Sequence, residues 1–341
     1  MQLTVEQIKS ITCGAVRILE EEKGLRFWRF TKEQEEMYYD TRALTGMNYA
    51  GRSRASAGVR FAFRTDSTKL HLSVEAEPST TRSYFDFQVL VNGVSIGSLN
   101  NHGDRLYPLG RPKACYSLEE IAKTFALGTG EKLIEVYFPW SVCPFVKAVE
   151  LDEGSYVEPV KRKKTLLIYG DSITQGYDSI DLSGHYTAKL AKLLDADIVN
   201  KAIGGEIFHP PLAKLKDDLD PDYITVSYGS NDFRKTDGAT FDADCKAFYT
   251  ALRENYPNAK IFALTPIWRG DLDEACSFGD FSTVEKRIEK AVADIPDVTV
   301  IHGYDFVPHD PKMFAELYLH PTDEGFVYFG RNVCAEVCKY I

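Results

Sequence analysis

The first half of the chain shows the alternation of apolar and polar residues that is typical of half-buried β-strands. Residues 59–63 and 70–74 place an apolar side chain at every second position, and the turn formers at 65–67 separate them. Asn92-Gly93 lies between two β-branched runs and predicts a tight hairpin, because both residues adopt positive φ angles readily. Further strands are expected at residues 133–140 and 145–151. Many short strands with turns between them predict an antiparallel β-sandwich or jelly roll.

The second half has a different rhythm, in which short apolar strands alternate with helical segments. The basic stretch at residues 160–164 is interpreted as a solvated lead-in to this part. Strands are expected at residues 165–169, 196–200, 222–228, 260–266 and 298–303, and helices at 186–196, 245–255 and the C-terminus. This order predicts a parallel sheet flanked by helices. The 341 residues are therefore divided into a sandwich domain, 1–158, and an α/β domain, 159–341.

Composition and charge narrow the class of protein. Hydrophobic residues make up 44% of the chain and charged residues 26%, which is typical of a globular protein with real cores. The formal net charge of −10 argues against nucleic acid or an anionic membrane as a partner, because both bind clustered positive charge. A neutral or modestly polar small molecule fits better.

The sequence also bears on location. The first 24 residues lack the pattern of a signal peptide, and no run of about 18 apolar residues predicts a membrane span. Seven cysteines are scattered without metal-ligand spacing. These features predict a cytoplasmic protein.

Candidate chemistry follows the first parallel strand. Ser172 lies where strand 165–169 turns toward a helix, in the string Gly-Asp-Ser-Ile-Thr of residues 170–174. Parallel sheets place ligands at this edge, and the free N–H groups of a helix start stabilise negative charge there. Taken alone, Ser172 is better interpreted as a helix N-cap, which is common at such turns.

Three further segments favour catalysis over capping. Asn200–Gly205 and Gly229–Asp232 follow two neighbouring strands, so they are expected at the same edge of the sheet as Ser172. Glycine lets main-chain N–H groups approach a ligand and asparagine supplies a neutral donor, which suits an oxyanion hole; a tight turn is the alternative for each segment. The last segment is His320-Pro-Thr-Asp-Glu-Gly, a histidine just before a predicted helix N-cap at Thr322.

These four segments, in this order, resemble the four blocks of the SGNH (GDSL-like) hydrolases, over about residues 164–341. The resemblance implies a three-layer α/β/α fold. It also implies Ser172 as nucleophile, His320 as general base, and an oxyanion hole made by the N–H groups of Ser172 and Gly205 and the amide of Asn231. Acyl transfer would then run through an acyl-serine, with no metal or organic cofactor.

One position departs from the family pattern. Members usually carry an aspartate three residues before the histidine, where this chain has Leu317. Some carbohydrate esterases of this fold use a Ser–His dyad with the imidazole held by a backbone carbonyl, and we favour that arrangement here. Glu316, Asp310 and Asp305 are the alternatives for a third member.

Several other residues at the same edge are candidates for the substrate pocket. They are Asp171, His209, Trp268 and Arg269. Asp171 and Asp232 are expected to brace loops through main-chain hydrogen bonds. For Trp268 and Arg269, core packing and a salt bridge are the alternatives.

The order of a β-sandwich followed by an SGNH domain resembles that of carbohydrate acetyl esterases, including family 2 of that classification. This implies removal of acetyl groups from O-acetylated sugars or oligosaccharides. Two alternatives stay open: a lipase or thioesterase of the same fold, and a carbohydrate-binding protein on an inactive hydrolase scaffold. The sandwich is also a candidate interface for a homo-oligomer.

Overall fold

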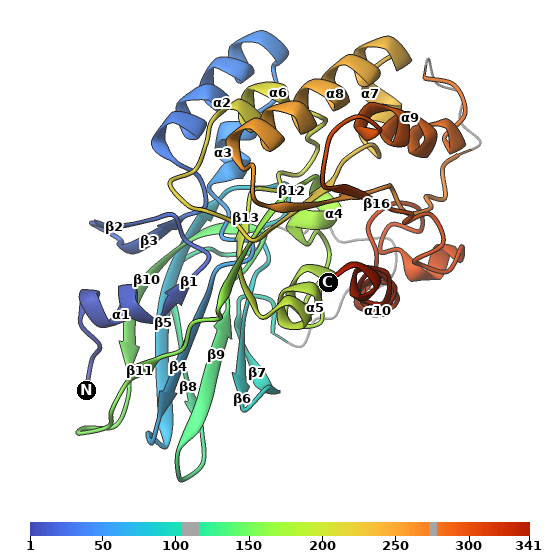
Figure 1. Ribbon diagram of the computed structural model, residues 1–341. Coiled ribbons are helices and arrows are strands. Elements are labelled where there is room, and N and C mark those ends of the chain that lie inside the picture. The colour runs from blue at the N-terminus through green and yellow to red at the C-terminus, as the bar shows by residue number, and fades with distance from the viewer. Residues whose placement is uncertain (104–115, 273–277) are drawn as a thin grey trace.

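The computed structural model describes residues 1–103, 116–272 and 278–341. Its chain forms an N-terminal antiparallel β-sandwich followed by an α/β domain with a five-stranded parallel sheet (Figure 1). The predicted fold class is confirmed. Cys115 and Cys276 lie outside the described residues, and the five described cysteines are free.

The sandwich consists of two antiparallel sheets. One has the order β1 (Thr12–Cys13), β4 (Arg60–Thr65), β9 (Lys132–Tyr137), β6 (Asp86–Val91), β7 (Val94–Asn100), with β11 (Glu158–Pro159) against β4. The other has the order β2 (Arg17–Glu21), β3 (Gly24–Trp28), β10 (Val142–Glu150), β5 (Lys69–Pro78), β8 (Ile121–Ala126). The hairpin between β6 and β7 turns at Asn92 and Gly93, whose φ angles are 49° and 79° as a tight turn requires. Edge-on contacts among Phe27, Phe61 and Phe138 fill the core between the sheets.

The α/β domain has the parallel strand order β13 (Ala196–Asn200), β12 (Lys164–Gly170), β14 (Tyr223–Ser227), β15 (Lys260–Leu264), β16 (Val298–Ile301). One face is covered by α6 (Pro210–Lys214), α8 (Gly238–Asn255) and α9 (Ser282–Val292). The other face is covered by α5 (Tyr186–Leu194) and α10 (Asp323–Val337). The short helices α4 (Ser172–Gln175) and α7 (Asp232–Lys235) start at the carboxyl ends of β12 and β14, and η1 (Pro311–Met313) and η2 (Cys338–Tyr340) are 3₁₀ turns. The sheet therefore presents its strand ends to one site.

The described residues among the first 158 also form three helices that the alternation of residues did not predict. They are α1 (Val5–Ile11), α2 (Lys32–Thr45) and α3 (Tyr49–Ser53). Thr31 and Gln34 form a capping box at the start of α2. In Figure 1, α2 and α3 lie beside α6 and α8, and Tyr38 and Tyr49 are buried in the core of the α/β domain. Because the two parts share this core, the domain boundary at residue 158 stays a prediction.

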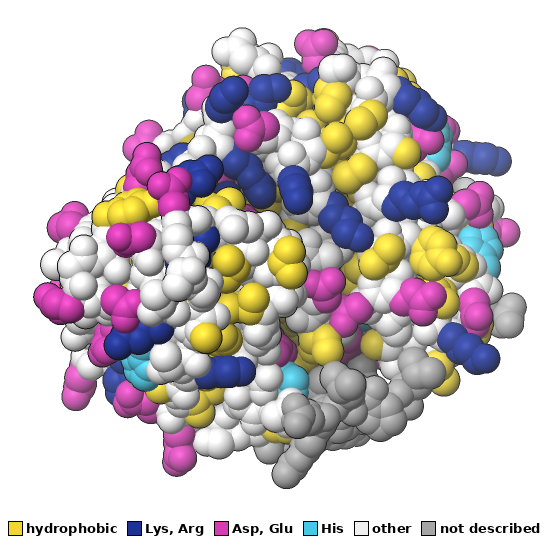
Figure 2. All heavy atoms as spheres, turned by 90° about the horizontal axis from the view of Figure 1, so that it is seen from below, with side chains coloured by type: hydrophobic (Ala, Val, Ile, Leu, Met, Phe, Trp, Pro, Cys, Tyr) yellow, Lys and Arg dark blue, Asp and Glu magenta, His cyan; other side chains and the backbone are white. Residues whose placement is uncertain are grey.

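No helix of the described residues is both long enough and apolar enough to cross a bilayer. The face seen in Figure 2 mixes acidic, basic and hydrophobic side chains. Such a mixed face does not present a broad charge of one sign to a polyanion.

Candidate active site

Ser172 and His320 are brought together from positions 148 residues apart. Asp171, not Ser172, is the N-cap of α4, and its carboxylate accepts from the N–H of Ile173. Ser172 is thus the first residue of the helix, with its hydroxyl free for another partner. That partner is His320, whose Nε2 lies 2.8 Å from Ser172 Oγ. Both side chains are almost fully buried.

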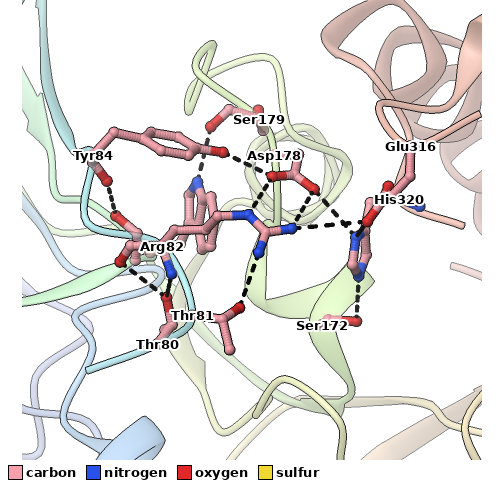
Figure 3. Close-up of polar contacts among 11 residues, drawn as sticks. Thr80, Thr81, Arg82, Tyr84, Ser172, Asp178, Ser179, Glu316 and His320 are labelled. Carbon is pink, nitrogen blue, oxygen red and sulfur yellow. Dashed lines mark hydrogen bonds and ion pairs between the residues drawn. The ribbon is translucent and has the colours of Figure 1, made fainter. Parts of the chain in front are cut away.

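The other ring nitrogen of His320 faces two carboxylates (Figure 3). Glu316 contacts Nδ1 and also accepts from the His320 main-chain N–H at 3.1 Å, and Asp178 Oδ2 lies 3.2 Å from Nδ1. The predicted dyad with a backbone carbonyl is therefore wrong. Leu317 has a left-handed φ of 70°, so the chain folds back between Glu316 and His320. This turn brings Glu316 to the imidazole, although Glu316 lies four residues before the histidine and the family's aspartate lies three before it.

The sandwich supplies part of this arrangement. Arg82 lies in the loop between β5 and β6 and reaches Asp178 with two hydrogen bonds, of 2.9 Å to Oδ1 and 3.2 Å to Oδ2. The hydroxyl of Tyr84 donates to Asp178 Oδ1 at 2.8 Å. Asp178 itself has a φ of 67°. Neither Asp178 nor Arg82 was found from the sequence, because no motif links a loop of the sandwich to the histidine.

These charges alter the acidity of the site. Burial by itself lowers the pKa of the His320 imidazole, but the hydrogen bonds and charges of Asp178 and Glu316 outweigh it and raise that pKa to about 9. Burial raises the pKa of the Asp178 carboxyl, yet His320 and Arg82 hold it well below its usual range. The imidazole is thus poised to hold a proton, and both carboxylates stabilise that state.

The other two acidic candidates lie elsewhere. Asp305 pairs with His309 at 3.1 Å, and Asp310 caps the 3₁₀ turn η1. Neither contacts His320 among the described interactions.

The three expected oxyanion segments are tied together by hydrogen bonds. Ile203 N–H donates to the Gly170 carbonyl at 3.0 Å, and the amide of Asn231 donates to the Glu206 carbonyl at 3.0 Å. Gly205 has a φ of 84°, which favours glycine. Within the described part of the chain its N–H has no hydrogen-bond partner. This N–H group is therefore an available donor, and its role in catalysis stays a prediction.

Buried acids brace these loops. Asp232 accepts from the N–H groups of Phe208 and Gly229, each at 3.0 Å. Burial raises the pKa of Asp171 to about 6 and that of Asp232 to about 7. His185 caps α5 and lies 3.0 Å from the Ile173 carbonyl. Asp171 and His185 hold the main chain next to Ser172 in place, and Asp232 holds the loops that contain Phe208 and Gly229.

Glu206 is a further buried group that the sequence did not reveal. Its carboxylate accepts from the hydroxyls of Tyr38 at 2.7 Å and Tyr228 at 2.9 Å. Burial raises its pKa to about 8. Since Tyr38 belongs to α2 and Glu206 follows Gly205, the N-terminal helices help to fix the oxyanion segment.

The remaining pocket candidates mostly make internal contacts. His209 stacks on Tyr38 with ring centroids 6.1 Å apart, and burial lowers its pKa to about 4. Trp268 stacks on His309 at 5.3 Å. Arg269 is paired with Asp271 and donates to the Ser230 carbonyl, next to Asn231. Their part in binding substrate stays a prediction.

Two groups of described side chains have the donor atoms that a metal ion needs. Asp178, Glu316 and His320 form one, and Glu285, Glu289 and His302 form the other. In the first group, Arg82 already supplies a positive charge to Asp178. The second group is largely exposed and includes a His302–Glu285 pair at 3.1 Å.

Comparison with known proteins assigns a class to this site. Residues 168–326 match the model of the GDSL-like Lipase/Acylhydrolase family. The part of the chain that carries Ser172 and His320 is therefore similar to this family of hydrolases. No curated protein is similar enough in sequence to count as a match.

Solved structures share both halves of the fold. The chain resembles a salicylyl-acyltransferase from a tetracycline biosynthetic pathway (TM-score 0.75, 22% identity, 96% of this chain and 94% of that one). It also resembles a family two carbohydrate esterase from Clostridium thermocellum in complex with cellohexaose (TM-score 0.62, 15% identity, 83% of this chain and 92% of that one). A third similar structure is that of an acetyl xylan esterase from the rumen bacterium Butyrivibrio proteoclasticus (TM-score 0.61, 16% identity, 100% of this chain and 97% of that one). At these identities the likeness shows the fold.

Proposed function

We propose that the chain is a serine esterase that removes short acyl groups, acetyl above all, from O-acetylated carbohydrates. The observation that carries this proposal is the 2.8 Å contact between Ser172 Oγ and His320 Nε2, with carboxylates on the opposite ring nitrogen. A serine that contacts a histidine, which in turn contacts an acid, is the arrangement of a nucleophilic acyl-transfer site.

In this proposal each group has its own role. Neutral His320 takes the proton of Ser172 as the hydroxyl attacks the ester carbonyl, and the imidazolium then gives that proton to the leaving alcohol. Asp178 and Glu316 stabilise the imidazolium and hold the ring. The N–H groups of Ser172 and Gly205 and the amide of Asn231 stabilise the negative charge on the carbonyl oxygen. Water, activated by His320, then releases the acid.

A polar groove that borders the segment after Asp178 supports a sugar as the alcohol. It has a volume of about 390 Å³ and lies where β6 and β7 meet the segment after Asp178 and the start of α10. Its side chains include Asp86, Gln88, Asn100, His102, Asp181 and Asp323. Carboxylates, amides and an imidazole suit a ligand rich in hydroxyl groups. The cellohexaose-bound esterase and the acetyl xylan esterase among the structural neighbours support the same substrate class.

Transfer of the acyl group to a hydroxyl other than water is a second candidate. The acyltransferase from the tetracycline pathway favours it, since it covers nearly the whole chain. Both reactions use the same acyl-serine and differ only in the acceptor.

The test is hydrolysis of 4-nitrophenyl acetate and butyrate, together with acetate release from acetylated xylan and mannan oligosaccharides. Wild type is compared with Ser172→Ala and with Ser10→Ala, an exposed serine of α1 that serves as control. We expect acetate release that is lost in Ser172→Ala alone. A folded wild-type protein that releases no acid from any ester would contradict the proposal. Loss of 4-nitrophenyl acetate only when an alcohol is added would favour acyl transfer.

A further inference from the structure

Two cationic side chains lie against Gly205, the expected oxyanion donor. Arg52 of α3 donates from Nη1 to the Gly204 carbonyl, and Lys235 of α7 donates from Nζ to the Gly205 carbonyl. A Cβ atom on Gly205 would lie 2.6 Å from Arg52 Nη1 and 3.4 Å from Lys235 Nζ. One cation comes from the N-terminal half of the chain and the other from the α/β domain. They meet beside the proposed acyl site.

This pair has no acidic partner among the described residues. Other arginines near the site do: Arg82 is paired with Asp178, and Arg269 with Asp271. Burial and the neighbouring charge of Arg52 lower the pKa of the Lys235 ammonium. Two like charges held close together without a carboxylate destabilise each other.

The buried acids nearby, Asp171 among them, favour the charged form of Lys235, but none forms an ion pair with Lys235 or Arg52 among the described residues. Asp232 accepts hydrogen bonds from main-chain N–H groups, and Glu206 accepts from two tyrosines. Because the pKa of Glu206 is raised to about 8, this side chain is mostly protonated at neutral pH. Positive charge therefore remains available at Arg52 and Lys235.

We propose that Arg52 and Lys235 bind an anionic group, a carboxylate or a phosphate, which the ester substrate carries close to its scissile bond. Resting on the proposed esterase function, this inference narrows its substrate class. Arg52 and Lys235 each have one described acceptor, yet a guanidinium has five N–H donors and an ammonium three. Arg52 is half-buried and Lys235 exposed, so the unused donors can meet a ligand at the mouth of the site. The anion belongs either to the acyl part or to the alcohol.

The experiment compares matched pairs of esters with the full-length protein. For the acyl side, mono-4-nitrophenyl succinate is compared with 4-nitrophenyl butyrate. For the alcohol side, an O-acetylated methyl glucuronoside is compared with the O-acetylated methyl glucoside. The variant is Arg52→Gln with Lys235→Gln, because glutamine keeps a neutral donor for the Gly204 and Gly205 carbonyls. The control, Lys192→Gln with Arg64→Gln, removes two positive charges from exposed positions of α5 and β4.

We expect kcat/KM of wild type to favour the anionic member of one pair by about tenfold or more, as a charge-assisted hydrogen bond would give. The preference should fall as salt is added, and it should disappear in the double variant but not in the control. Equal rates within both pairs would overturn the inference and leave the esterase proposal intact. A preference that survives in the double variant would also overturn it. No hydrolysis of any ester would remove both proposals.

Discussion

Arg82 meets Asp178 through two parallel hydrogen bonds, of 2.9 and 3.2 Å, and Asp178 in turn lies 3.2 Å from Nδ1 of His320. The arginine belongs to a loop of the β-sandwich, whereas the aspartate and the histidine belong to the α/β domain. Forked pairing of this kind fixes direction as well as charge. The sandwich thereby takes part in orienting the proposed general base.

Replacing Arg82 by glutamine should lower kcat by about 10- to 100-fold. Without the two hydrogen bonds from Arg82, the Asp178 carboxylate no longer fixes the orientation of the His320 imidazole. KM should change much less, since Arg82 acts through Asp178. Steady-state kinetics with 4-nitrophenyl acetate separate the two constants. Arg82→Lys should recover little, because an ammonium cannot form the fork. An unchanged kcat in Arg82→Gln would show that Asp178 needs no such support.

Activity should rise with pH until about pH 9. His320 must be neutral to accept the Ser172 proton. Burial lowers the pKa of its imidazole, but Asp178 and Glu316 outweigh burial and raise that pKa to about 9. Below that pH the protonated fraction dominates, so kcat/KM should fall about tenfold for each pH unit. The profile for 4-nitrophenyl acetate, corrected for spontaneous hydrolysis, gives the midpoint. A midpoint near pH 6.5 would mean that the two carboxylates do not stabilise the imidazolium.

Removing either carboxylate should shift this profile. Asp178→Asn and Glu316→Gln each take away a charge that favours the imidazolium, so the midpoint should move to lower pH. The maximal rate should fall by about 10- to 100-fold in each single variant and further in the double variant, because residues acting as a unit are not additive. Asp310→Asn is a suitable control, since Asp310 caps η1 instead. If the midpoint stays in place in both variants, neither acid acts on His320.

Asn231→Ala should lower kcat by about 100- to 1000-fold, as for other oxyanion donors. The amide now donates to the Glu206 carbonyl, so the loop also loses one hydrogen bond. Circular dichroism and the unfolding midpoint separate loss of fold from loss of chemistry. A folded Asn231→Ala protein with nearly full kcat would exclude Asn231 from the oxyanion hole.

Tyr38→Phe should lower the free energy of unfolding by about 1–3 kcal/mol, because it removes a donor from the buried Glu206 carboxyl. Urea unfolding followed by fluorescence measures the change. Tyr328→Phe, on an exposed tyrosine of α10, should change it by less than about 0.5 kcal/mol. Equal stability of both variants would mean that the Glu206 cluster does not tie α2 to the oxyanion segment.

Local patterns were sufficient for much of the fold. The alternation of residues predicted β4, β5 and the β6–β7 hairpin, and the rhythm of apolar runs predicted the parallel strands. The cap of α10 at Thr322 was also expected and is observed. These features depend on periodicity and turn chemistry, which neighbouring residues carry.

Helices α2 and α3 escaped prediction for the opposite reason. Their segment lies among strands, and their apolar residues, such as Tyr38 and Tyr49, are buried by the distant α/β domain. Nothing close in sequence indicates that partner, because tertiary packing provides most of the stability of short helices.

The sequence by itself determined the two-part fold and placed Ser172, Gly205, Asn231 and His320 at the end of one sheet. It could do so because the carboxyl ends of parallel strands meet at one edge. Only the tertiary structure decided what holds His320. Asp178 reaches the imidazole through a left-handed backbone turn, Glu316 through the turn at Leu317, and Arg82 from the sandwich. Such contacts depend on how separate segments pack in space, and no spacing along the chain records them.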